Sequence, residues 1–193
     1  RVLKLVPDAP LRGRIVSTEG RPVSGAKIEV LTISEGKNQS LDAWLAAAKE
    51  KDSDYNSARR HLNYLTSGRF NSGPRWAVLP PAKTDDDGWF TLNGMGRERT
   101  AEIFVSSPGI ETSMLHVFNR AADVISIATE QRNPDQRIKL YPTEFTHVAG
   151  PSVAGVLIAS FGIEGCYIVQ CGLALATAAS PNLTKAPPGS QVA

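Results

Sequence analysis

Histidines, aspartates and serines are the residues of this sequence whose types could do chemistry at a site. The three histidines, His61, His116 and His147, lie in separate segments, with neither an HExxH motif nor a pair at i, i+4. A zinc site built from them would need three distant elements to converge. The serines lack the Gly-x-Ser-x-Gly elbow of a nucleophile, and the chain has no Walker loop and no dinucleotide fingerprint. We therefore predict no catalytic residue and no enzymatic activity.

A run of three aspartates, Asp85, Asp86 and Asp87, precedes Gly88. Carboxylate oxygens are the ligands that calcium prefers, so Asp85 and Asp87 are weak calcium candidates. An EF-hand loop would also need a glutamate about six residues after its glycine, and Gly94 stands there instead. An Asp-Gly pair before a strand is also what a tight turn requires. We favour the turn, and predict neither a metal nor another cofactor.

Three tryptophans offer flat apolar faces on which a sugar ring could stack. Trp44 falls in a segment of helical periodicity, where we expect it to pack internally. Trp89 follows a turn, and its side chain is predicted to point to the polar face of its strand, away from the apolar face of Phe90. Trp76 lies in a predicted loop. Trp76 and Trp89 are therefore the candidate ligand-binding residues, with carbohydrate as the ligand.

The composition is that of a folded globular domain. Of the 193 residues, 41% are hydrophobic and 21% are charged, and the net charge is +2. So small a charge, without clustered basic and aromatic residues, argues against a nucleic-acid partner. The two cysteines, Cys166 and Cys171, both lie near the end, so residues 1–150 must be held together by an apolar core. We expect these two cysteines to be structural or inert.

The sequence changes character near Pro151, which we take as the domain boundary. Residues 151–193 contain only two charged residues, Glu164 and Lys185. The stretch 153–179 is almost wholly apolar or small, and a Pro/Ser/Gly-rich end that we expect to be disordered follows it. The apolar stretch is long enough to span a bilayer, but its central Glu164 argues against a membrane span. Our preferred interpretation of this segment is a truncated second domain. A third interpretation is that the tail is not the natural continuation of the chain.

Residues 1–150 read as an all-β domain, because short alternating segments are separated by turn signals. The first two segments, 11–16 and 27–33, flank a Gly-Arg-Pro turn and are predicted to form a hairpin. The remaining predicted strands are 89–92, 100–106, 111–118, 124–128 and 137–141.

Residues of about 36–76 break this pattern and are predicted to be a helical insertion between early strands. Their apolar residues recur near a seven-residue period, which indicates one helical face. The residues of this predicted face are Leu41, Trp44, Ala48, Tyr55, Ala58, Leu62 and Leu65. Ser40 is the predicted first cap, Ser53 or Asp54 the cap of a second helix, and Ser67-Gly68 the stop. The insertion is expected to pack on an open sheet edge or face. A lid or a partner-binding arm is the alternative.

Two motifs of this domain resemble those of carboxypeptidase regulatory-like domains. The first is Leu-Arg-Gly-Arg-Ile-Val at 11–16, continued by Gly-Arg-Pro-Val-Ser-Gly-Ala-Lys-Ile-Glu-Val at 20–30. The second is Thr-Asp-Asp-Asp-Gly-Trp-Phe-Thr-Leu at 84–92, followed by Gly94 and later by Gly109. The match covers about residues 9–118 and is interrupted by the insertion. The resemblance implies a seven-stranded, transthyretin-like or CnaB-like β-sandwich.

In that family the domain is an accessory module beside other domains, or one of a tandem array. The chain begins at Arg1 without an initiator Met, which favours a fragment of a longer protein. We therefore predict a non-catalytic structural or interaction module of a larger multidomain protein, bacterial and extracytoplasmic, although no targeting signal is in view. The alternative is a glycan- or peptide-binding accessory module of a secreted enzyme. The expected partners are other domains of the same chain or another protein, with carbohydrate as a further candidate.

Overall fold

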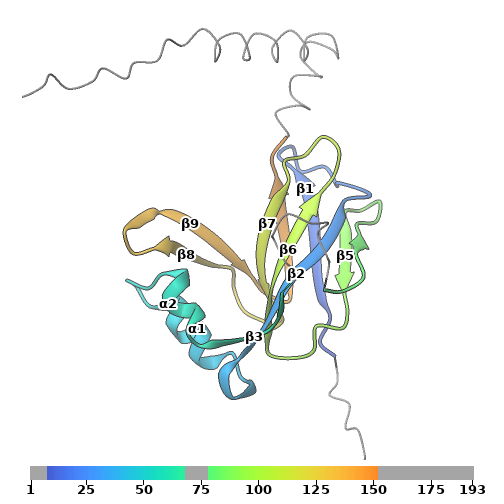
Figure 1. Cartoon of the computed structure of the whole chain (residues 1–193). Coiled ribbons are helices and arrows are strands. Elements are labelled where there is room, and N and C mark those ends of the chain that lie inside the picture. The colour runs from blue at the N-terminus through green and yellow to red at the C-terminus, as the bar shows by residue number, and fades with distance from the viewer. Residues whose placement is uncertain (1–7, 68–77, 152–193) are drawn as a thin grey trace, which may run out of the picture. The chain divides into compact units, whose positions relative to one another are not determined.

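The computed structural model describes residues 8–67 and 78–151, and about half of these residues form two β-sheets (Figure 1). The all-β prediction is thereby confirmed, including a small helical insertion between early strands. The strands are β1 Leu11–Ser17, β2 Lys27–Gly36, β3 Leu62–Ser67, β4 Ala82–Lys83, β5 Trp89–Leu92, β6 Arg99–Ser106, β7 Ser113–Phe118, β8 Ile125–Glu130, β9 Asn133–Tyr141 and β10 Glu144–Ala149. The helical turns are η1 Lys37–Gln39, α1 Asp42–Lys49 and α2 Tyr55–Arg59.

The smaller sheet has the strand order β10-β1-β5, and the larger sheet has the order β3-β2-β6-β7-β9-β8, with β4 pairing with the start of β2. Two of these pairings are parallel, β1 with β10 and β7 with β9. The β7–β9 ladder is short, because the recorded pairs are only His116 with Leu140 and Val117 with Tyr141. Beyond them, the β8–β9 hairpin extends away from β7 (Figure 1).

The main core lies between the two sheets, as the alternation along each strand requires. In β1, Leu11 and Ile15 are fully buried, whereas Arg12 is exposed. The inward residues of β2, β5, β6, β7 and β10 also belong to this core, and the ring centroids of Phe90 and Phe145 lie 6.0 Å apart within it. Burial of this apolar surface is the main driving force for joining the sheets.

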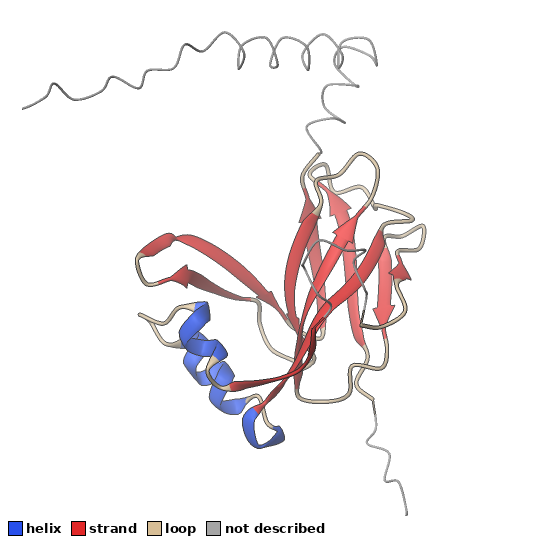
Figure 2. Cartoon of the chain, in the orientation of Figure 1, coloured by secondary structure: helices blue, strands red, loops and turns tan. Residues whose placement is uncertain are grey.

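A second apolar cluster lies on the other face of the larger sheet, where α1 and α2 pack near the β8–β9 hairpin (Figure 2). Trp44 is 1% exposed, and its ring meets the ring of Phe118 edge-on at 5.4 Å between centroids. Leu140 of β9 belongs to the same cluster. The helical insertion thus covers a sheet face, as predicted, and Trp44 packs internally.

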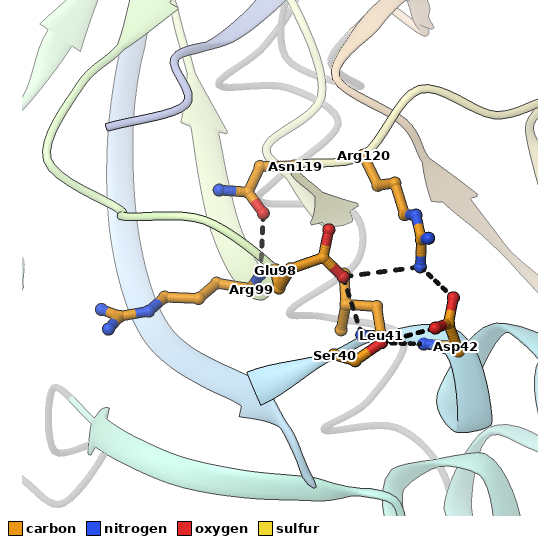
Figure 3. Close-up of polar contacts among 7 residues, drawn as sticks. All are labelled: Ser40, Leu41, Asp42, Glu98, Arg99, Asn119 and Arg120. Carbon is orange, nitrogen blue, oxygen red and sulfur yellow. Dashed lines mark hydrogen bonds and ion pairs between the residues drawn. The ribbon is translucent and has the colours of Figure 1, made fainter. Parts of the chain in front are cut away.

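Polar contacts fix the start of this insertion to the ends of β6 and β7 (Figure 3). Glu98 Oε2 accepts the backbone N–H of Leu41 at 2.9 Å and lies 3.4 Å from the Arg120 guanidinium. Arg120 also pairs with Asp42, the first residue of α1. Ser40 Oγ accepts the N–H of Asp42, but the N-cap position of α1 is Leu41, which has no side-chain cap, so the predicted cap at Ser40 is wrong by one residue.

The insertion differs from the prediction in its second half. The second helix ends at Arg59, and residues 62–67 form β3 instead of continuing to a stop at Ser67-Gly68. The predicted helical face therefore wrongly included Leu62 and Leu65, because both lie on a strand that pairs with β2, where Leu62 packs against the second cluster and Leu65 is 41% exposed. The predicted cap Asp54 is confirmed, because its side chain accepts the N–H of Ser57 at 2.8 Å.

The predicted hairpin of residues 11–16 and 27–33 is wrong, because β1 and β2 belong to different sheets. Val16 forms a bridge with Pro22 after the turn, and the chain then crosses between the sheets. The strand β10 at 144–149 was not predicted. Within the described ranges, the strands number ten, three more than the seven that the resemblance implies.

The predicted domain boundary near Pro151 and the whole 153–193 tail, with both cysteines, lie at or beyond the end of the described residues and stay predictions. Among residues 8–67 and 78–151, no helix has the length and apolarity needed to cross a membrane.

Candidate functional site

The candidate site is the cavity where β7 and β9 separate beyond their short ladder, which we call the β7–β9 fork. Its volume is about 550 Å³. Residues of β10, the strand that pairs with β1, also line this cavity. The lining residues are 111–116 of β7 and the segment before it, 137–139 and 141 of β9, and 146–148 of β10.

Side chains of β9 reach the fork from two faces of the larger sheet, because successive strand residues point to opposite faces. Tyr141 belongs to the core between the sheets, so Lys139, two residues before it, lies on that inner face. Leu140 and Ile138 belong to or pack on the cluster under the helices and lie on the outer face. The fork therefore has a charged inner side with Lys139 and a more apolar outer side. Two further charged residues, Arg137 and Glu111, also line the cavity.

His147 of β10 is the most unusual group on the inner side. Its Nδ1 lies 2.9 Å from the Tyr141 hydroxyl, and its Nε2 is buried with no hydrogen-bond partner in the described part of the chain. If the hydroxyl donates to Nδ1, only the Nε2–H donor is left unsatisfied. The opposite assignment would leave both the tyrosine O–H and the Nε2 lone pair without partners. The first arrangement is therefore favoured, and it makes Nε2 a donor.

The pKa of His147 is lowered from its usual value near 6.5, first by burial and second by the positive charge of Lys139. Lys139 is exposed, and no ion pair of its ammonium group occurs among the described residues. A neutral imidazole with a free N–H and a nearby ammonium group together favour a ligand that supplies acceptor oxygens.

His116 of β7 lines the same cavity and is held by residues from two other elements. Its Nδ1 lies 3.0 Å from the hydroxyl of Tyr55 in α2, and that hydroxyl donates to Glu102 of β6 over 3.4 Å. Burial lowers the pKa of His116, with Arg59 acting in the same direction and Glu102 opposing them. Burial also raises the pKa of Tyr55. His116 is thus a neutral ring whose orientation depends on the helical insertion.

Of the two predicted ligand-binding tryptophans, Trp76 lies outside the described residues. Trp89 is half-buried on the outer face of the smaller sheet, opposite the inward Phe90 as predicted. The Arg12 guanidinium lies 4.2 Å from the centre of its ring, and that of Arg14 lies 5.7 Å away. A sugar that stacks on this face would have to displace Arg12, and the carbohydrate interpretation stays a prediction.

The aspartate run forms the predicted turn. Asp85 Oδ1 accepts the backbone N–H groups of Asp87 and Trp89 at 3.0 and 2.8 Å, and Gly88 has a φ of 79°. Asp86 accepts the hydroxyl of Ser24. In residues 8–67 and 78–151, no three acidic, histidine or cysteine side chains are grouped so that they could hold a metal ion.

Sequence reasoning missed the fork because its residues come from strands whose pairing is not local. His116 and His147 stand 31 positions apart in the sequence, yet both line one cavity. Tyr141 and Lys139 carry no motif. The one available signal was that Lys139 and Tyr141 alternate with apolar residues in a predicted strand, which places them on one face.

Comparison with known proteins finds no matching family model and no matching curated protein. Solved structures that are similar include hydroxyquinol 1,2-dioxygenase from Pseudomonas putida DLL-E4, at 14% identity and a TM-score of 0.37. They also include 3-chlorocatechol 1,2-dioxygenase from Rhodococcus opacus 1CP, at 13% and 0.39, and catechol 1,2-dioxygenase from Acinetobacter sp. ADP1, at 12% and 0.38. The matches cover 77–78% of this chain, and it spans 59%, 62% and 54% of those three chains.

These comparisons correct two predictions, that the chain is a purely non-catalytic module and that it is not an enzyme. The similar structures are enzymes, and the arrangement of strands is therefore no ground for either statement. At this identity and TM-score, the similarity assigns neither a dioxygenase activity nor any catalytic residue to this chain.

Proposed function

We propose that this chain contains a ligand-binding β-sandwich domain of the carboxypeptidase regulatory-like type, and that its β7–β9 fork binds a small anionic group such as a carboxylate. The observation that carries the binding proposal is that two donors line the same cavity. One is the buried Nε2 of His147, which has no hydrogen-bond partner among the described residues, and the other is Lys139. Two donors of this kind are complementary to carboxylate or phosphate oxygens.

The family part of the proposal is supported by the structural roles of the two motifs. A Cβ at Gly13 would lie 2.4 Å from the Phe90 ring, and one at Gly88 would lie 2.4 Å from the carbonyl oxygen of Ile15. The Thr84 hydroxyl accepts the N–H of Ala26 and donates to the carbonyl of Val23. Residues of the first motif thus pack directly on residues of the second, which gives a physical reason for their occurring together.

The test is a titration of the full chain with acetate, succinate and inorganic phosphate, followed by NMR of the three histidine rings. We expect saturable shifts of the His147 ring signals with at least one of these anions. Lys139→Ala should weaken that affinity about tenfold, the effect of losing one charged donor. Lys83→Ala, which removes an exposed lysine from β4, is the matched control and should leave it unchanged.

The pH dependence of the anion affinity provides a second test. A bound anion favours the protonated ring, so binding should raise the pKa of His147, and affinity should rise as the pH falls. Histidine signals that do not move, or an equal loss of affinity in both lysine variants, would refute an anion site in the fork.

A further inference from the structure

Two strand edges face the fork without a recorded partner. One edge of β7 pairs with β6, and the other edge pairs with β9 only at His116 and Val117 in the described residues. Residues 113–115 therefore form an open edge on the β9 side. On β9, residues 137–139 pair with β8 on one side and, among the described residues, with nothing on the other. Backbone groups on such edges are a template for a further strand.

The side chains around the fork differ between its two faces. Met114 is 48% exposed and alternates with the core residue Leu115, so it lies on the outer face beside Ile138. Lys139 and His147 lie on the inner face, as argued above. A strand that enters the fork would therefore point alternate side chains toward an apolar surface and toward a donor pair.

We infer that the fork accepts an extended segment of a partner protein, in which apolar and acidic residues alternate, and that this segment pairs with the open edge of β7. This inference rests on the proposed function, since it identifies the bound carboxylate as an aspartate or glutamate side chain of the partner. The apolar residues of the segment cover Met114 and Ile138, and the acidic residues meet Lys139 and His147. Val148 of β10, 56% exposed, also lines the cavity.

The probe is an acetylated and amidated peptide of alternating valine and glutamate, titrated into the full chain. One control peptide replaces the glutamates with lysines. A second control is methylated at alternate backbone nitrogens, which removes the donors that a strand needs while keeping its side chains. Affinity is measured by calorimetry, and pairing is measured by amide hydrogen exchange at residues 113–115 and 137–139.

We expect the valine–glutamate peptide to bind at least about tenfold more tightly than succinate, because backbone pairing and apolar contacts add to the charge contact. Exchange at open-edge amides of β7 should slow about tenfold or more on binding. Both control peptides and Lys139→Ala should lose most of this affinity, whereas Lys83→Ala should keep it.

The outcomes separate the two proposals. If succinate binds through Lys139 but the peptide binds no more tightly and protects no amide, the strand inference fails and the anion site stands. If neither binds, both fail. If the edge amides are already protected in the free chain, the fork is filled by a second copy or by another segment of this chain, which overturns the partner inference; the dependence of protection on concentration tells these two apart.

Discussion

Gly88 and Gly20 show how one residue type serves two different purposes in this domain. Both have a positive φ, 79° and 78°, which disfavours any side chain. A Cβ at Gly88 would also lie 2.4 Å from the carbonyl oxygen of Ile15, whereas a Cβ at Gly20 would meet nothing within 4 Å. At Gly88 the turn and the close approach of β1 both require glycine, and at Gly20 only the turn does.

Replacing these two glycines by alanine separates the two requirements. Gly20→Ala should lower the free energy of unfolding by about 1 kcal/mol, the cost of a left-handed backbone with a side chain. Gly88→Ala adds a backbone clash and should cost about 2–4 kcal/mol. Urea denaturation of both variants measures the difference, and equal losses would show that the contact with Ile15 is unimportant.

At the scale of elements, the short helix α2 couples the insertion to the fork. Its cap Asp54 is 5% exposed and accepts both the N–H and the hydroxyl of Ser57. The first residue of this helix, Tyr55, holds the His116 ring, and the two ring centroids lie 4.7 Å apart. A helix of five residues has little stability of its own, so its cap and its packing must keep it in place.

Asp54→Ala should lower the free energy of unfolding by about 1 kcal/mol, as loss of an N-cap does. It should also speed amide exchange in α2 and shift the His116 ring signals, because Tyr55 loses its support. Asp52→Ala, at an exposed aspartate two positions earlier, is the matched control. The coupling would be disproved if the Asp54 variant lost stability while the His116 signals stayed in place.

At the scale of the whole molecule, two histidines are kept neutral by burial, His116 in a sheet face covered by the helices and His147 at the edge of the smaller sheet. In the unfolded chain both rings take a proton near pH 6.5, and in the folded chain only at lower pH. Protons therefore favour the unfolded state in this range.

The stability that these rings contribute is complete above about pH 6.5 and is lost as the pH falls from there through their lowered pKa values. We expect urea midpoints to fall between about pH 7 and about pH 5, and the double variant His116→Gln, His147→Gln to reduce that slope. The carboxyl groups with lowered pKa values, Asp8, Glu19 and Asp42, titrate below this window. A slope unchanged in the double variant would assign the effect to other groups.

Local patterns in the sequence were enough to identify most strands, the Asp-Gly turn and the Asp54 cap. These features depend on neighbouring residues: alternation reports which side chains share a face, and a cap is a contact within three positions. For the same reason Trp89 and Phe90 were placed correctly on opposite faces of β5. The prediction for the second half of the insertion was wrong because the three-residue spacing of Leu62 and Leu65 indicates a helix, whereas pairing with the distant β2 makes this segment a strand.

Only the tertiary structure shows which strands are neighbours. It therefore also shows which residues come together at the candidate site. Alternation assigns a residue to a face but does not name the strand beside it, so β1 was joined to β2 and not to β10 and β5. One cavity is lined by His116, Tyr141 and His147. It exists because β7 and β9 are joined by only two residue pairs and then separate. Such non-local pairing is selected by burial of the whole core, which no short stretch of sequence contains.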